Sequence, residues 1–108
     1  MPTFTYLTKF RIDLQKFSSG EELLESWQAE AQAASQGISE GVFQLWKDAA
    51  EPVVYGILNI EADNIAQASW NLYNSALALP MGTRGEFVLE EARVVVPYQQ
   101  WAETLANA

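Results

Sequence analysis

Residues 3–13 read TFTYLTKFRID, and the alternation within this stretch decides the fold. Aromatic and β-branched side chains fall on one face at every second position, whereas the other face mixes polar, aliphatic and basic side chains. This period of two, with these residue types, predicts a β-strand whose two faces meet different surroundings. The first face holds Phe4, Tyr6, Thr8, Phe10 and Ile12, and the second holds Thr5, Leu7, Lys9 and Arg11.

Two helices are predicted by their capping residues and by apolar side chains at helical spacing. Ser18 or Ser19, each followed three residues later by a glutamate, forms a capping box, and Gly37 is a natural stop for the helix. A second helix is expected from about residue 64 to residue 79, capped by Asp63 and ended by Pro80. In the first helix the buried stripe is Leu23, Leu24, Trp27, Ala31 and Ala34, and the first turn and solvent side hold Glu21, Glu22, Glu25 and Glu30.

Three further strands complete the pattern. Residues 42–47 and 52–60 form a predicted hairpin, and residues 87–96 form a last strand that ends before Pro97. The order β-α-β-β-α-β, with right-handed crossovers, predicts an α+β fold with a four-stranded antiparallel sheet and both helices on one face. Residues 1–108 are then one domain, with residues 97–108 as a C-terminal tail that forms a short helix or a dimer arm.

Composition excludes several classes of function. Acidic residues outnumber basic ones by 14 to 6 and the net charge is −8, which argues against nucleic acid and anionic membrane surfaces as partners. The chain has no cysteine and no histidine, so it offers no disulfide, thiolate nucleophile, Cys/His zinc site or Ser-His-Asp triad. We expect a cytoplasmic protein without a cofactor, in which a carboxylate, lysine or tyrosine would serve as any general base.

The sheet face away from the helices is predicted to pair with a second copy of the chain. Leu7, Tyr55 or Val54, and Leu89 are expected there, and together they are too apolar to remain in water. A homodimer or higher oligomer would bury this face and partly enclose a space between two sheets.

Several short motifs resemble those of a known family. Leu45-Trp46-Lys47 on the second strand, Tyr55 on the third and Leu79-Pro80-Met81 at the end of the second helix are similar to the muconolactone isomerase-like members of the dimeric α/β-barrel superfamily. The resemblance implies a ferredoxin-like βαββαβ fold, a homodimer or assembly of dimers, and a ligand pocket between sheet and helices. It also implies cofactor-free isomerisation of an unsaturated lactone by proton transfer, although this chain has no histidine and carries an extended tail around Trp101.

Lys9 and Glu91 are the candidate catalytic residues. The first and last strands should be neighbours, which places this pair together on the face away from the helices, with Glu90 on the opposite face. One interpretation is that Glu91 shuttles a proton while Lys9 steadies an enolate-like or carboxylate group. The other is an ordinary cross-strand ion pair.

Further residues are candidates for ligand binding, each with a structural alternative. Arg11 needs a carboxylate or an anionic ligand if it is buried. Arg84 is either a lid cation for a substrate carboxylate or a solvated loop charge. Aromatic side chains that line an apolar pocket or simply fill the core are Tyr6, Trp46, Tyr55 and Trp70.

Three functions therefore remain open. The chain is a cofactor-independent isomerase or lyase acting on a small unsaturated lactone or acid, a non-catalytic module that binds a small apolar or aromatic molecule, or an assembly protein. In the last case the open sheet face and the aromatic tail would serve oligomer contacts. No metal site is predicted.

Overall fold

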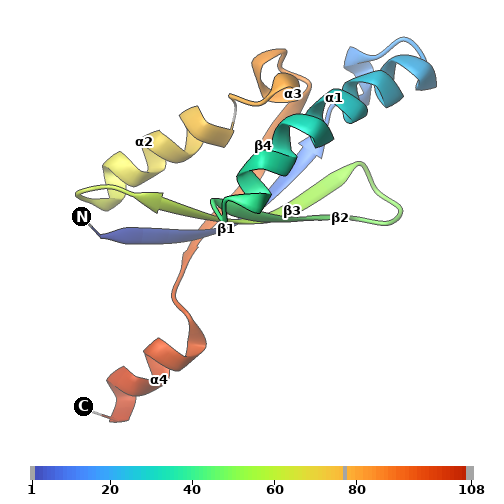
Figure 1. Ribbon diagram of the computed structural model, residues 1–108. Helices are drawn as coiled ribbons and strands as arrows, with labels where there is room; N and C mark the ends of the chain where they lie inside the picture. Colours follow the sequence, from blue (N-terminus) through green and yellow to red (C-terminus); the bar gives the residue numbers. More distant parts are fainter. Residues whose placement is uncertain (1, 77, 107–108) are drawn as a thin grey trace.

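The computed structural model describes residues 2–76 and 78–106, which form an α+β structure with one four-stranded antiparallel sheet (Figure 1). The strands lie in the order β2-β3-β1-β4, so β1 is central and pairs with both β3 and β4. This confirms the predicted four-stranded antiparallel sheet and the predicted pairing of the first and last strands. The elements are β1 (Thr3–Ile12), a 3-10 turn η1 (Leu14–Lys16), α1 (Gly20–Ser39), β2 (Phe43–Lys47), β3 (Val53–Glu61), α2 (Ile65–Ala76), α3 (Pro80–Thr83), β4 (Phe87–Val95) and α4 (Tyr98–Ala106).

The core lies between one face of the sheet and the helices α1, α2 and α3 (Figure 1). Along β1 the residues Tyr6, Phe10 and Ile12 are buried there, as the alternation predicts. They meet Leu58 and Ile60 of β3, with Leu72 of α2 and Met81 of α3 in the same cluster, and the Phe10 and Phe87 rings pack edge to face with centroids 5.1 Å apart. No helix within residues 2–76 and 78–106 packs on the opposite face, which we call the open face.

A bulge in the β1–β4 pairing changes which side chains reach the open face. Lys9 pairs with Glu91, but Phe10 pairs with Leu89, so Glu90 is an extra residue in β4. A bulge of this kind turns the following side chains to the other face. Leu89 therefore packs against the core, and Glu90 contacts Lys9 and Arg11. The predictions that Leu89 lies on the open face and Glu90 on the opposite one were wrong for this reason.

Helix α1 begins as predicted and ends later. The Ser19 hydroxyl accepts a hydrogen bond from the Glu22 backbone N–H, and the Glu22 carboxylate accepts from Ser18. The helix continues through Gly37 to Ser39, and Gly41, with φ of 74°, follows its end. Gly37 instead allows close packing, because a Cβ atom there would lie 2.4 Å from the Phe43 ring.

Helix α2 is shorter than predicted. It ends at Ala76, residue 77 lies outside the described residues, and Leu79 is an extended residue that precedes α3. Its cap is Asn64 and not Asp63, because the Asn64 side chain accepts a hydrogen bond of 2.9 Å from the Gln67 N–H. Pro80 is the first residue of α3, where its missing N–H costs nothing.

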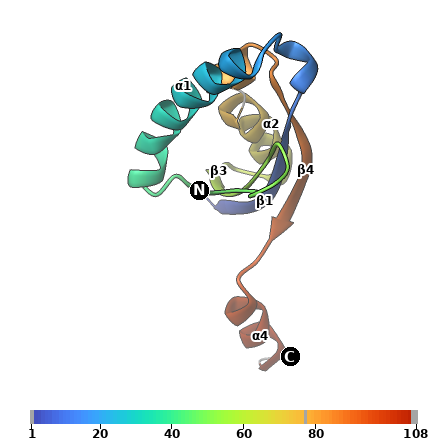
Figure 2. The ribbon, with the colours of Figure 1, turned by 90° about the vertical axis from the view of Figure 1, so that its right-hand side faces the viewer.

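Helix α4 stands away from the rest of the structure, on the open side of the sheet (Figure 2). It forms part of the predicted tail, and none of its residues is buried. The structure measures 56 × 28 × 24 Å, and α4 marks one end of its long dimension in both views. Among the helices described here, none combines the length and apolar character that crossing a membrane would need.

We predict that Gly37→Ala destabilises the protein although alanine favours helices. The gain in helix propensity is about 1 kcal/mol, whereas overpacking against the rigid Phe43 ring costs about 1–3 kcal/mol. Denaturant unfolding should therefore give a lower free energy of unfolding for Gly37→Ala than for the wild-type protein. Gly20→Ala is the matched control, since no atom lies within 4 Å of a Cβ placed there, and it should be neutral or stabilising. A Gly37→Ala variant as stable as the Gly20→Ala variant would contradict this packing.

Candidate functional site

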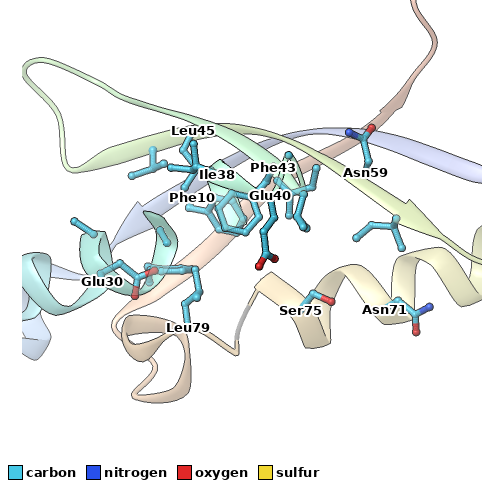
Figure 3. Close-up of a pocket in the computed structure, with 18 of the residues that line it drawn as sticks. Phe10, Glu30, Ile38, Glu40, Phe43, Leu45, Asn59, Asn71, Ser75 and Leu79 are labelled. Carbon is cyan, nitrogen blue, oxygen red and sulfur yellow. The ribbon is translucent and has the colours of Figure 1, made fainter. Parts of the chain in front are cut away.

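A cavity of about 770 Å³ lies between α1, α2 and the helix-covered face of the sheet. Figure 3 shows Phe10, Phe43 and Leu45 on the sheet side of this space, with Asn71 and Ser75 of α2 across from them. The volume falls within the range of about 300–1,000 Å³ that is usual for small-molecule sites.

The cavity walls are mainly apolar because they belong to the buried faces of the elements around them. Trp27 and Ala34 lie on the inner side of α1, while Phe43 and Leu45 of β2 point to the same face as Leu58 of β3. Small side chains on α1 leave room that larger ones would fill. An apolar space of this size favours a ligand that is largely apolar itself.

Glu30 places a carboxyl group in this apolar wall. Its residue is 6% exposed, and Oε1 accepts a hydrogen bond of 2.8 Å from the Met81 backbone N–H in the first turn of α3. Oε2 has no hydrogen-bond partner among the described residues. No fully buried side-chain oxygen in the described part of the chain lacks a hydrogen-bond partner, so Oε2 is accessible although it belongs to a largely buried side chain that lines the cavity.

Burial raises the pKa of the Glu30 carboxyl above its ordinary value. The hydrogen bond from Met81 and the nearby Arg84 act in the opposite direction, but desolvation is the larger effect. A carboxyl group with a raised pKa can donate a hydrogen bond when neutral and accept a proton when charged. It is the chemically most distinctive group of the cavity.

The other charged residues around the cavity make it unsuited to anions. Glu40 and Glu61 line it together with Glu30, against a single cation, Lys47. The Lys47 ammonium donates hydrogen bonds of 2.6 Å to the carbonyl oxygens of Asp48 and Glu51 and lies 5.8 Å from the centre of the Trp27 ring. That cation is therefore already engaged, and a bound carboxylate would meet a surplus of negative charge.

Arg84, predicted as a lid cation or a solvated loop charge, forms a small cluster beside the cavity. Its guanidinium donates to both carboxylate oxygens of Glu86 at 2.9 Å and to the Ser26 hydroxyl at 2.5 Å. The Ser26 hydroxyl also donates to Glu86 at 2.5 Å, and the Arg84 guanidinium lowers the pKa of the Glu86 carboxyl. These bonds tie α1 to the turn before β4, so Arg84 has a structural role here.

The predicted catalytic pair lies on the open face, on the other side of the sheet from the cavity. Lys9 and Glu91 are cross-strand neighbours, as predicted, but the Lys9 ammonium lies 3.4 Å from Glu90. Glu91 lies 3.8 Å from the Arg93 guanidinium. The bulge that brings in Glu90 supplies Lys9 with a second neighbouring carboxylate, and the catalytic roles of Lys9 and Glu91 stay predictions.

Arg11 has the firmest ion pair on the open face. Its Nε donates to Glu90 at 2.6 Å, and its Nη1 lies 3.7 Å from Glu51 of the hairpin. The hydrogen bond to Arg11 lowers the pKa of the Glu90 carboxyl, and the same bond raises the pKa of Arg11. The charge of Arg11 is therefore compensated within the chain, without an anionic ligand.

The four predicted aromatic residues occupy three different places. Tyr6 is buried in the core, and its hydroxyl lies 3.0 Å from the Ser69 hydroxyl. Trp46 and Tyr55 face each other across β2 and β3 on the open face, and both are about half exposed. Trp70 is 67% exposed on α2. None of the four lines the cavity.

Sequence reasoning missed Glu30, which it assigned to the solvent side of α1. The helical spacing held a usable signal, because Glu30 lies three residues after Trp27 and four before Ala34, both on the buried stripe. Glu30 was nevertheless assigned to the solvent side, because a glutamate is rarely buried without a charged partner. Phe43 was missed as a cavity residue because its position depends on Gly37.

Comparisons of the chain with family models, curated proteins and solved structures found no match. The similarity to the isomerase family thus stays a prediction, and the function has to be inferred from the geometry. Within residues 2–76 and 78–106 no three carboxylates converge in the manner of a metal site.

We predict that Glu30→Gln stabilises the protein increasingly as the pH rises. Because the folded chain raises the Glu30 pKa, the neutral form contributes stability below the ordinary carboxyl pKa, and this stability is lost as pH rises through the folded pKa. Glutamine keeps the acceptor for Met81 and never ionises.

Denaturant unfolding of both proteins between pH 4 and pH 8 gives the difference in free energy of unfolding, which should grow in favour of Glu30→Gln over the interval above pH 4.5. Carboxylates with lowered pKa values, such as Glu86 and Glu90, change stability in the opposite direction but are present in both proteins. A difference that shrinks with pH would mean that Glu30 is favoured as an anion.

Proposed function

We propose that this protein binds one small, mainly apolar and uncharged molecule in the cavity between α1, α2 and the sheet. The observation that carries the proposal is Glu30, a buried carboxyl group on the wall of an apolar cavity with one oxygen unpaired among the described residues. Because Oε2 is accessible, a ligand that enters the cavity can form a hydrogen bond with it.

The ligand class follows from shape and charge. An aromatic or alicyclic body suits the walls around Phe43 and Trp27, and a carbonyl oxygen would accept a hydrogen bond from neutral Glu30. Free acids are disfavoured by Glu40 and Glu61, since Lys47 is already engaged. Of the two predicted substrate types, the neutral lactone fits and the acid does not.

A second candidate function is cofactor-independent isomerisation of an unsaturated lactone by proton transfer, the reaction of the family that the chain resembles. Glu30 favours it, because a raised pKa brings a carboxyl group closer to the range in which it both takes and returns protons. The carboxylate would take a proton from one ring carbon, and the acid so formed would return it to another. Lys9 and Glu91 are the alternative pair, and they would need a second copy to enclose their face.

We also propose that the protein pairs with a copy of itself through the open face. Leu7, Trp46 and Tyr55 are about half exposed there, and Val88 and Val95 are exposed on the same face near the two ends of β4. Large apolar side chains gathered on one exposed face are typical of an interface. Its ion pairs are compatible with burial because the charges already have partners.

Binding can be tested with two dyes that differ by one charge. N-phenyl-1-naphthylamine is neutral, and 8-anilino-1-naphthalenesulfonate adds a sulfonate to the same ring system. We expect the neutral dye to bind with a rise in fluorescence, and the sulfonate to bind roughly ten-fold or more weakly, because the carboxylates around the cavity repel it.

A substitution that fills the cavity tests whether the dye binds there. Ala34→Leu should weaken binding of the neutral dye roughly ten-fold or more, because the added atoms occupy the space beside Phe43. Ala29→Leu is the matched control in the same helix, on its exposed side and away from the cavity. Equal dye affinity in the two variants would place the dye elsewhere, and no binding to the wild-type protein would contradict the proposed function.

Proton transfer can be tested with a β,γ-unsaturated five-membered lactone, whose conversion to the conjugated isomer is followed by ultraviolet absorbance. If Glu30 carries the reaction, Glu30→Gln lowers turnover roughly hundred-fold or more, while Glu91→Gln leaves it unchanged. If instead Glu91→Gln lowered turnover and Glu30→Gln did not, the reaction would take place on the open face. Absence of turnover in the wild-type protein, together with dye binding, would leave the binding function and remove the isomerase.

A further inference from the structure

We propose that α4 is an exchanged arm, which docks on the open face of a second copy of this chain. The inference rests on the self-pairing proposed above and names the segment that completes it. The starting observation is that α4 leaves the end of β4 on the open side of the sheet and contacts too little of its own chain to bury any of its residues (Figures 1 and 2).

The helix has one apolar side and no surface to cover it. Tyr98, Trp101 and Leu105 lie three and four residues apart, so they share one side of α4, and they are 77%, 46% and 56% exposed. The Tyr98 and Trp101 rings lie 5.4 Å apart. Gln100 lies on the opposite side. An isolated helix of nine residues is marginal in water, so α4 needs a surface for its apolar side.

The open face of another copy matches that side. Trp46 and Tyr55 are cross-strand neighbours on β2 and β3, and Leu7 and Ile57 are paired in the adjacent row of β1 and β3, so the four side chains form an apolar group on this face. The facing surfaces thus both present aromatic and aliphatic side chains. The link between β4 and α4 is only Val96-Pro97, so the helix starts near the edge of its own sheet.

The buried surface area favours a dimer in which α4 of each copy takes part over a dimer in which only the two sheets touch. With strands of about ten residues rising about 3.3 Å each and spaced about 4.8 Å apart, the open face covers roughly 500 Å². Two such faces bury about 1,000 Å², below the size of about 1,200–2,000 Å² that is usual for a specific interface. An apolar helix from each copy would bring the total into that range.

Charge also favours a copy of this chain. Three of the six basic residues, Lys9, Arg11 and Arg93, lie on the open face, each within 4 Å of Glu90 or Glu91. Their charges are compensated locally, although the chain as a whole has a net charge of −8. Two such acidic molecules repel each other over most of their surfaces, and least where this face meets its equivalent.

The first test changes one side of α4 at a time in the full chain. Trp101→Glu should weaken the dimer roughly ten-fold or more in light scattering across a dilution series. Gln100→Glu adds the same charge on the opposite side of the helix and should leave the dimer unchanged. Equal effects of the two variants, or no effect of Trp101→Glu, would overturn the arm.

The second test uses the absence of cysteine from the chain, which gives a clean background for cross-linking. A tagged Leu105→Cys chain is mixed with an untagged chain that carries Leu7→Cys or Val88→Cys, and a flexible bis-maleimide is added. We expect a covalent pair of one tagged and one untagged chain, at twice the 12.0 kDa of the monomer. Gln28→Cys on the outer side of α1 is the control and should give little product.

The outcomes separate the arm from the self-pairing on which it rests. A dimer by light scattering whose cross-link forms only within a doubly substituted Leu105→Cys/Leu7→Cys chain would place α4 on its own sheet. A dimer without cross-links above the Gln28→Cys level would also overturn the arm, while both results leave self-pairing intact. A wild-type protein that is monomeric at all concentrations would overturn both.

Discussion

The pairing of β1 with β3 on one side and β4 on the other is the constraint on which the rest of the structure depends. A central strand has its backbone bonds fixed on both edges, so its side chains must alternate between two faces. Tyr6 and Phe10 enter the core, and Lys9 and Arg11 enter the open face. The cavity and the charged face therefore lie back to back, with one sheet between them.

What could be predicted from the sequence is what depends on one segment at a time. The alternation in residues 3–13 predicts the strand and its buried face, and Ser19 predicts the start of α1, because these signals are local. The positions of Leu89 and Glu90 could not be predicted, because they depend on a bulge between two strands that are far apart in the sequence. Gly37 shows the same limit, since Phe43 and not the helix end explains it.

The cavity around Glu30 was not predicted from the sequence, for a physical reason. Sequence reasoning looked for unusual residues in strands and found Lys9, Arg11 and Glu91, which the structure places on the open face. The cavity depends on small side chains in α1 and on one carboxyl group, Glu30, whose burial is visible only when α3 is in place. Packing between helices and strands forms such a site, and the spacing of residues along the sequence indicates that packing only weakly.

Glu30 has a structural role in the fold, whatever the function of the protein. It satisfies a backbone N–H in the first turn of α3, where Leu79 provides no side-chain cap. A glutamine would accept that hydrogen bond without a charge to bury, so the hydrogen bond alone does not explain a carboxyl group. The proposed ligand, by using the proton in a hydrogen bond or in a transfer, would explain it.

Ligand binding and self-pairing are separable in this architecture. The cavity lies on the helix-covered face of the sheet, and the proposed pairing surface lies on the opposite face. Pairing could affect the cavity only by moving β1 and β3, because their side chains lie in the core on one face of the sheet and on the open face on the other. A packed sheet resists small shifts, so docking on the open face would stabilise the floor of the cavity more than it would reshape it. The ligand should accordingly be bound with similar affinity by the monomer and the dimer, although the dimer would be the more stable protein.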